Sequence, residues 1–325
     1  MVLKDSFDYA GKSYPVNDAE YKATGALVYA SDMTLPGMLY MELVCSERAH
    51  AEITSVDARS ALKCRGVAEV FTHWNSTDKK YNHCRKTPLQ QNVPEDKELF
   101  TSRARYAGDV IAAVVAESRE AAREGRAAEI AYRDLPVSAS IEAAAEDESF
   151  PIHEGGNRIC ETDYSYGTGE ERGDAADSFR SSLESQQVNH AAMETHAYLA
   201  DWSNGELTIW TPTQGVYGVR TVVADLLEIP YSKVRVIKVP MGGSFGGKQE
   251  FLYEPHAAYA AMRMGRPVKL HLTRTQSLIS TTVRPALKTS VETSFTSEGD
   301  FVSCSVDSLV NSGAYTGIAK NSSKR

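Results

Sequence analysis

The sequence has no long apolar run, no excess of positive charge and few cysteines. Its 325 residues include 35 Lys and Arg against 43 Asp and Glu, which gives a net charge of -8. This balance argues against a nucleic-acid surface or a basic membrane-binding face. No apolar stretch has the length of a membrane span, and the start, MVLKDSFDYAGKSY, lacks the apolar core of a signal peptide. We therefore expect a cytoplasmic protein, with neither membrane nor nucleic acid among its partners.

The five cysteines are scattered along the chain and never have C-x-x-C spacing. They argue against a disulfide framework, a structural zinc site or an iron–sulfur cluster held by this chain alone. We expect most of them to be small buried hydrophobic residues. The remaining composition is that of an ordinary globular protein, with 42% hydrophobic and 24% charged residues. The length favours two domains over one.

The first region, to about residue 145, alternates strand and helix patterns. The strands are predicted within residues 35–46, 66–73, 103–118 and 130–136, and the helices within residues 55–64 and 119–129. Such alternation favours an α/β or α+β domain. Between residues 142 and 187 the sequence becomes acidic and rich in Gly and Ser. This composition predicts an extended connection rather than core.

A periodic apolar pattern returns after this connection. The turn SNGE predicts a hairpin between residues 190–202 and 207–214. Apolar residues at helical spacing predict a helix within YGVRTVVADLLEIP, and a β-branched run then predicts a strand entering a glycine-rich loop. The elements expected after the loop are a helix over 250–264 and strands within 266–274, 286–295 and 301–317.

The glycine-rich loop has the G-x-x-x-x-G-K spacing of a phosphate-binding P-loop, from Gly242 to Lys248. The next residue is Gln249, whose amide is a poor substitute for the magnesium-binding hydroxyl of Ser or Thr. Phe245 is bulky for a phosphate cradle, and the following strand pattern ends in Arg274 instead of a metal-binding Asp. A nucleotide site stays a minor alternative, which predicts Mg·ATP binding that is lost on Lys248→Ala.

Together with its neighbours, the loop resembles part of the molybdenum-binding subunit of the xanthine dehydrogenase and aldehyde oxidase family. The family's G-G-x-F-G-x-K loop is matched by residues 242–248, its T-Q pair by Thr213 and Gln214, and its H/Q…M/L-E segment by NHAAMET at 189–195. In the first region, YAGDVIAAVVAES and YRDLPVSASIEAA are similar to two further family segments. The resemblance runs from about residue 18 to the end of the sequence.

This resemblance implies an α+β fold. An α/β-hammerhead domain over residues 1–145 would be followed, over residues 146–325, by the first half of a molybdopterin-binding domain that is incomplete relative to the family. The implied cofactor is molybdenum–molybdopterin, in its plain or its cytosine dinucleotide form. The 2Fe–2S clusters and FAD of the family are expected on partner chains or domains.

The resemblance also implies the cofactor-binding residues Gln214, Gly243, Phe245 and Gly246. Gln214 would hydrogen-bond the oxo face of the molybdenum centre, and the backbone N–H of Phe245 would point at a metal oxygen. Both residues would act on the metal without bonding to it directly. Gly243 and Gly246 would let the backbone come close enough to do so.

The family hydroxylates an activated carbon of an N-heterocycle or an aldehyde with oxygen from water, and its general-base glutamate lies in the second half of the molybdenum domain. This sequence stops soon after NSGAY, so we expect no catalytic residue in it. The expected partners are a chain that carries the second half, together with iron–sulfur and FAD subunits. A truncated fragment, or a non-catalytic assembly protein of the family, is the alternative.

Gln249 is the implied substrate-binding residue. It occupies a position at which purine-oxidising members carry a glutamate that binds the heterocycle. Glutamine can both donate and accept a hydrogen bond, but it has no charge and cannot act as a base. The substrate therefore stays open between xanthine, an uncharged azaheterocycle and an aromatic aldehyde.

Other polar residues near these motifs have ordinary interpretations. Glu194 would order the strand near the cofactor rather than act as a catalytic carboxylate. His190 and His196 lack a third ligand at a spacing suited to a metal site. Lys248 would satisfy loop carbonyls or contact a phosphate, and Arg274 would form an ion pair at a strand end or line a substrate funnel.

Overall fold

The computed structural model describes residues 8–86, 94–126, 129–146, 150–167 and 175–317. The helices are α1 (Ala19–Thr24), α2 (Ala58–Lys63), α3 (Arg119–Gly125), α4 (Ile141–Ala145), α5 (Val216–Leu227), α6 (Glu254–Met264) and α7 (Arg274–Ser280), with a 3-10 turn, η1 (Tyr231–Lys233). The strands are β1 (Leu39–Cys45), β2 (Ala51–Val56), β3 (Val67–Thr72), β4 (Arg103–Ala104), β5 (Val110–Ala116), β6 (Ile130–Asp134), β7 (Asp177–Ser185), β8 (Val188–Asn189), β9 (Ala197–Ser203), β10 (Glu206–Thr211), β11 (Val234–Lys238), β12 (Val268–His271), β13 (Val283–Arg284), β14 (Ala286–Phe295) and β15 (Phe301–Asn311).

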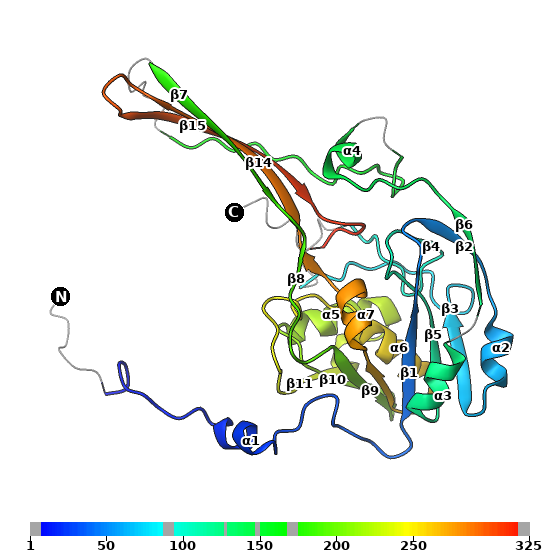
Figure 1. Ribbon diagram of the computed structural model, residues 1–325. Coiled ribbons are helices and arrows are strands. Elements are labelled where there is room, and N and C mark those ends of the chain that lie inside the picture. Colours follow the sequence, from blue (N-terminus) through cyan, green and yellow to red (C-terminus); the bar gives the residue numbers. More distant parts are fainter. Residues whose placement is uncertain (1–7, 87–93, 127–128, 147–149, 168–174, 318–325) are drawn as a thin grey trace.

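A seven-stranded mixed sheet forms the body of the molecule, in the order β11-β10-β9-β12-β1-β5-β3 (Figure 1). The pairs β10–β11 and β1–β12 are parallel, and the other neighbours are antiparallel. β5 reads VIAAVVA and is buried at every position, as expected for an interior strand covered on both faces. The sheet unites strands from both sides of residue 145, so the division into residues 1–145 and 146–325 stays a prediction.

Helices α5 and α6 contribute to the larger hydrophobic core, together with side chains of the central strands (Figure 1). Gly218 lets α5 come close to Phe251, because a Cβ added at residue 218 would lie 2.0 Å from the aromatic ring. α5 enters the core with Val219, Val222 and Val223, as its helical spacing predicted. This packing fixes the start of α5, immediately after the T-Q pair, against the segment that follows the glycine loop.

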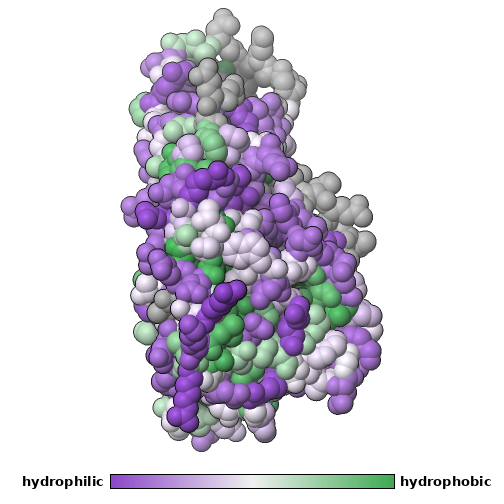
Figure 2. Space-filling model, turned by 90° about the vertical axis from the view of Figure 1, so that its right-hand side faces the viewer, coloured by the Kyte–Doolittle hydropathy of each residue, from purple (hydrophilic) through white to green (hydrophobic). Residues whose placement is uncertain are grey.

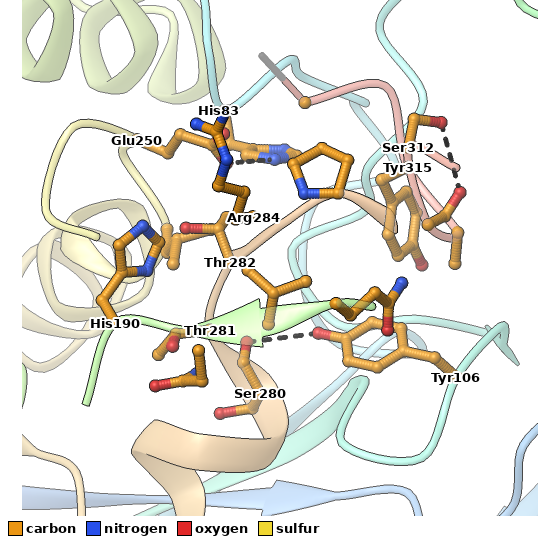
Figure 3. Close-up of a pocket in the computed structure, with 18 of the residues that line it drawn as sticks. His83, Tyr106, His190, Glu250, Ser280, Thr281, Thr282, Arg284, Ser312 and Tyr315 are labelled. Atoms are coloured by element: carbon orange, nitrogen blue, oxygen red, sulfur yellow. Dashed lines mark hydrogen bonds and ion pairs between the residues drawn. The ribbon is translucent and has the colours of Figure 1, made fainter. Parts of the chain in front are cut away.

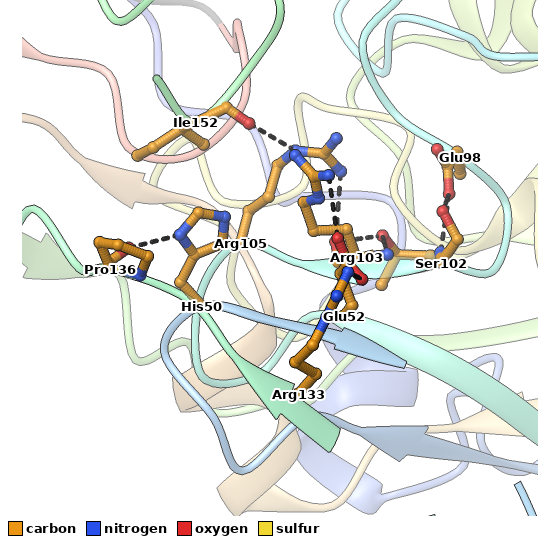
Figure 4. A network of polar contacts seen from close by, with 10 residues as sticks. His50, Glu52, Glu98, Ser102, Arg103, Arg105, Arg133, Pro136 and Ile152 are labelled. Atoms are coloured by element: carbon orange, nitrogen blue, oxygen red, sulfur yellow. Dashed lines mark hydrogen bonds and ion pairs between the residues drawn. The ribbon is translucent and has the colours of Figure 1, made fainter. Parts of the chain in front are cut away.

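A small sheet, β4-β2-β6, forms a second core with β1, β3, β5 and α2. A polar network reinforces this sheet, with Glu52 of β2 between Arg103 of β4 and Arg133 of β6 (Figure 4). Beside it, Arg105 Nε donates to the carbonyl of Ile152 at 3.2 Å, and His50 Nδ1 lies 2.6 Å from the carbonyl of Pro136. These contacts tie the chain beyond β6 back onto the first region.

The antiparallel sheet β15-β14-β7 extends away from the body as an arm (Figure 1). β7 lies within residues 142–187, so the prediction of an extended connection is wrong for this part. Its sequence, DSFRSSLES, is mostly exposed and lacks a clear apolar alternation, and its pairing with the distant β14 makes it a strand. Residues 147–149 and 168–174 of the expected connection lie outside the described residues.

The other predicted elements are confirmed, with two differences near the glycine loop. The helix expected from residue 250 begins at Glu254, where Pro255 occupies the first turn. The strand pattern 266–274 ends at His271, and α7 follows it, with a capping box between Thr273 and Gln276. A short helix of this kind has too few apolar positions to stand out in the sequence.

The face of the molecule on the α2 and α3 side is mainly hydrophilic, with smaller apolar patches between the polar side chains (Figure 2). In the described part of the chain, none of the helices combines the length and the apolar character that a bilayer crossing requires.

Candidate functional site

The glycine loop, residues 242–248, connects β11 to the segment before α6. Gly243 and Gly246 have φ values of 104° and 97°, a region that side chains rarely adopt. Between them, Phe245 has a φ of 53°, and its side chain is 79% exposed. A bulky residue held with positive φ and its ring in the open is an unusual arrangement, of the kind that occurs at binding sites.

The backbone of the loop offers hydrogen-bond donors in a short run. Among the residues that the structure describes, none accepts a hydrogen bond from the N–H groups of residues 243–246. The N–H groups on either side are occupied, since Gly242 donates to Glu194 at 2.9 Å and Gly247 donates to the carbonyl of Ser244 at 2.8 Å. Adjacent N–H groups of this kind in a glycine-rich turn form a concave site for an electron-rich oxygen.

Gln214 lies next to this loop. It follows β10 and precedes α5, and its backbone N–H donates to the carbonyl of Lys248 at 2.9 Å. Its side-chain Oε1 accepts a hydrogen bond from the Ser244 hydroxyl, and the residue is exposed. Because Oε1 is fixed by Ser244, the amide NH₂ of Gln214 remains as a donor beside the loop. The sequence did not single out Ser244.

A buried ion pair between Lys248 and Glu194 supports the glycine loop. Lys248 Nζ donates to Glu194 Oε2 at 2.6 Å, and the same carboxylate oxygen accepts from the N–H of Gly242. Lys248 is 3% exposed, and burial lowers the pKa of its ammonium while the Glu194 carboxylate opposes this shift. Lys248 therefore contacts a carboxylate, and not the loop carbonyls or the phosphate expected from the sequence.

The two histidines of the NHAAMETH segment also pack against the loop. His196 Nε2 donates to the carbonyl of Gly247 at 3.0 Å, and burial lowers the pKa of His196 to about 4, so its ring is neutral at physiological pH. A Cβ added at Gly247 would lie 2.9 Å from the ring of His190. His196 thus uses the ring nitrogen Nε2 to support the loop and does not offer it to a metal.

Arg274 also contacts the NHAAMETH segment, through its backbone. Its guanidinium donates to the carbonyls of Ala192 at 2.8 Å and Met193 at 2.6 Å. The expected ion pair at a strand end is therefore wrong, because Arg274 lies in the first turn of α7 and binds backbone oxygens.

A cavity of about 770 Å³ opens beside the loop (Figure 3). Phe245, Gly246 and Gln249 line it from the loop side. His190 and Arg284 line it from the segments around β8 and β13, which pair with each other. The structure thus brings Gln249 to a cavity wall next to the loop, and it places the charged residue Arg284, at the end of the short strand β13, on the same cavity.

These residues fit a molybdenum–pterin group. The group carries electron-rich oxygens, and the loop presents backbone N–H donors beside the Gln214 amide. A P-loop fits less well, because Lys248 is buried against Glu194, and α6 begins six positions after it, at Glu254. The helix N-terminus that would face a phosphate is therefore not at the loop.

Two family models match the chain. Residues 152–325 match the molybdopterin cofactor-binding domain, and residues 24–136 match the α/β-hammerhead domain of aldehyde oxidase and xanthine dehydrogenase. The chain belongs to the xanthine dehydrogenase and aldehyde oxidase family. The α+β fold, with a hammerhead domain followed by a molybdopterin-binding domain, is confirmed.

The chain is similar to molybdenum-binding subunits of this family. It is 36% identical over 301 residues to a probable xanthine dehydrogenase subunit of Bacillus subtilis, a match that covers 92% of this chain and 40% of the relative. It is 34% identical over 306 residues to the xanthine dehydrogenase molybdenum-binding subunit of Escherichia coli O157:H7, with 92% and 41% covered. The chain thus spans about two fifths of the length of these relatives.

Solved structures of the family share its fold. The aldehyde oxidoreductase from Desulfovibrio gigas matches with a TM-score of 0.80 and 26% identity, over 92% of this chain and 34% of that one. The quinoline 2-oxidoreductase from Pseudomonas putida 86 matches with a TM-score of 0.81 and 25% identity, over 92% and 39%. These two structures are oxidoreductases named for chemically different substrates, an aldehyde and quinoline.

Proposed function

We propose that this chain supplies the first half of the molybdenum-cofactor site of a xanthine dehydrogenase-like hydroxylase, which oxidises an N-heterocycle or an aldehyde with oxygen derived from water. The observation that carries the proposal is the position of Gln214 beside the N–H groups of residues 243–246, for which no described residue is an acceptor. Phe245 and Gly246 of this loop also line the neighbouring cavity.

When bound, the cofactor supplies the oxidation and the activation of water. The chain's own residues would hold and orient it. The Gln214 amide and the Phe245 N–H would donate to its oxygens, and Gly243 and Gly246 would let the backbone approach. Both contacts would fix the group without a protein atom bonded to the metal.

Gln249 would bind the substrate. Its side chain lines the cavity directly after the buried end of the loop, and its amide can donate to one ring atom and accept from another. Since glutamine is not a base, the general-base glutamate would come from the second half of the domain, outside this chain. The uncharged side chain of Gln249 would suit a neutral azaheterocycle or an aromatic aldehyde as well as a purine.

The chain spans about two fifths of the length of its relatives, and the proposed partners would supply the remainder. A second chain, or a continuation of this one, would carry the second half of the molybdenum domain, and without it the site would be inactive. Iron–sulfur and FAD subunits would take the electrons onward, and the pterin would be in its plain or cytosine dinucleotide form. The proposed location of this assembly is the cytoplasm.

The first test is a metal and pterin analysis of the protein purified from its native host, with the co-purifying chains identified by mass. The expected result is molybdenum and oxidised pterin at one equivalent per chain, together with iron–sulfur and flavin partners. A chain that carries no molybdenum even when its partners are bound would contradict the proposal and favour a non-catalytic assembly protein. Gly155→Ala, at an open loop position, serves as the control for any variant of the glycine loop.

A further inference from the structure

A second cluster of metal-binding side chains lies at the edge of the same cavity. His83 and Cys84, which are adjacent in a turn, meet Glu250, and their ligand-capable atoms all lie within 4.8 Å of one another. All three residues are buried, with exposed fractions of 4%, 1% and 7%. His83 Nε2 lies 2.9 Å from Glu250 Oε2 (Figure 3).

The backbone around the cluster is held in place. The Asn82 side chain accepts from the N–H of Cys84 at 2.8 Å and donates to the carbonyl of Thr316 at 3.0 Å. The N–H of Phe251 donates to the carbonyl of His83 at 2.8 Å, which ties the turn to the residue after Glu250. The three side chains therefore converge because their main chains are fixed. A ligand that binds them would lose little free energy to the ordering of these residues.

The hydrogen-bonding capacity of His83 is only partly used. Its Nδ1 is buried and has no hydrogen-bond partner within the described part of the chain. The Cys84 thiol lies beside the Glu250 carboxylate in the same buried cluster. Cysteine binds a metal ion as the thiolate, so the ion would displace the thiol proton.

We propose that His83, Cys84 and Glu250 bind a divalent transition-metal ion, with Zn²⁺ as the expected occupant. Imidazole nitrogen, thiolate sulfur and carboxylate oxygen form a donor set that suits Zn²⁺, and tetrahedral coordination places such atoms roughly 3.4 Å apart. Binding would release the Cys84 proton to solvent, and the two negative ligands would then offset the charge of the ion.

The fourth position faces the cavity. His83 and Glu250 line the cavity wall, and Cys84 is not among the lining residues. A Cβ added at Gly317 would lie 3.2 Å from Glu250 Oε1 and 3.5 Å from His83 Nε2, so the bare backbone there leaves room beside the cluster. Arg284 extends toward the same corner (Figure 3). A neutral complex of Zn²⁺ with thiolate and carboxylate could lie beside that cation, with water or a cavity ligand in the open position.

This site differs from the molybdenum site in its chemistry. The residues proposed to surround molybdenum make no bond to the metal, whereas this cluster would bind an ion directly. The scattered cysteines and the absence of C-x-x-C spacing argued against structural zinc, but Glu250 lies far from Cys84 in the sequence and the fold alone brings them together.

The test uses the complete chain with any co-purifying partners, and it measures bound zinc by elemental analysis and Co²⁺ binding by absorption. The expected result is one equivalent of Zn²⁺ per chain, and a thiolate-to-Co²⁺ charge-transfer band when Co²⁺ replaces it. Cys84→Ser should abolish the band, and His83→Ala should weaken Co²⁺ binding by more than the ~10- to 100-fold typical of changes outside the ligand shell.

His190→Ala is the matched control, because His190 lines the same cavity and is not part of the cluster. It should keep both the zinc and the charge-transfer band, and so should Cys160→Ser, at an exposed cysteine. A wild-type protein that holds no zinc and shows no thiolate band with Co²⁺ would overturn the proposal. Retention of both in a folded Cys84→Ser variant would overturn it equally.

Discussion

Lys248 and Glu194 form a buried ion pair, with Nζ and Oε2 2.6 Å apart, that connects the end of the glycine loop to its start. The connection exists because the same carboxylate oxygen also accepts from the N–H of Gly242. The pair is thus a clamp across residues 242–248, the loop in which the N–H groups of residues 243–246 have no acceptor among the described residues.

Breaking this clamp should destabilise the fold. Lys248→Met leaves Glu194 as a buried and uncompensated charge, and the expected loss in the free energy of unfolding is about 3–5 kcal/mol. Denaturant unfolding of Lys248→Met, Glu194→Gln and the double variant measures the coupling between the two residues. The exposed pair Lys233–Glu206 is the control, and its removal should cost less than about 1 kcal/mol. Equal costs for the two pairs would show that the clamp contributes no more than a surface contact.

Gly243→Ala should disturb the loop without affecting the core. The φ of Gly243, 104°, is unfavourable for a residue with a Cβ. We therefore expect the free energy of unfolding to fall by about 1–3 kcal/mol and the molybdenum content of the protein to decrease. Thermal unfolding and elemental analysis measure the two effects. Gly155→Ala, where a Cβ meets nothing within 4 Å, should change neither. Full molybdenum content in Gly243→Ala would argue against a close approach of the backbone to the cofactor.

Gln214→Ala tests the cofactor assignment most directly. In a complete complex, turnover should fall about 100-fold or more, since one preorganised donor is lost, while the unfolding free energy should change little because the residue is exposed. Steady-state turnover per bound molybdenum is the measurement. Tyr217→Ala, at another exposed residue three positions along, should stay near the wild-type rate. Wild-type turnover in Gln214→Ala would remove this site assignment.

Gln249→Glu tests substrate selection. A carboxylate in the cavity wall should raise kcat/KM for xanthine relative to an aromatic aldehyde, because it can bind the heterocycle with a charge that glutamine lacks. The ratio of the two kcat/KM values, measured in the same complex, gives the result. Gln187→Glu places the same charge elsewhere on the wall and should leave the ratio unchanged. An unchanged ratio in Gln249→Glu would place the substrate away from this residue.

Glu254 should make stability depend on pH. Burial raises the pKa of its carboxyl to about 7, above its ordinary value of 4.5, and Thr211 donates to its Oε1 at 2.8 Å. The folded state therefore holds the proton more tightly, and this group's contribution, present in full below the unfolded pKa, is lost as pH rises through about 7. Glu254→Gln keeps an acceptor for Thr211 and removes this loss.

The difference in unfolding free energy between Glu254→Gln and the wild type should shift in favour of the variant between pH 4.5 and about 7, by roughly 3 kcal/mol. A difference curve is needed because buried His196, whose folded pKa is lowered to about 4, contributes the opposite slope. A flat difference for Glu254→Gln would contradict the raised pKa.

Much of this protein could be predicted from the sequence. Strands such as β5 and helices such as α5 carry strong apolar periodicity, which is a local property of the chain. The pairing of Gln214 with the glycine loop could also be predicted, because the two motifs stand in an order that a family resemblance recognises. The positive φ of Gly243 and Gly246 follows from the residue type, since glycine alone adopts it without strain.

The contacts between distant residues could not be predicted in this way, because they depend on the complete fold. β7 became a strand because β14 pairs with it, and Lys248 contacts Glu194 instead of a phosphate. His83 and Cys84 meet Glu250 across more than half of the chain. Local sequence sets the backbone preferences of a segment, but the partner of a buried charge depends on which segments the core brings together, and this choice is a property of the whole fold.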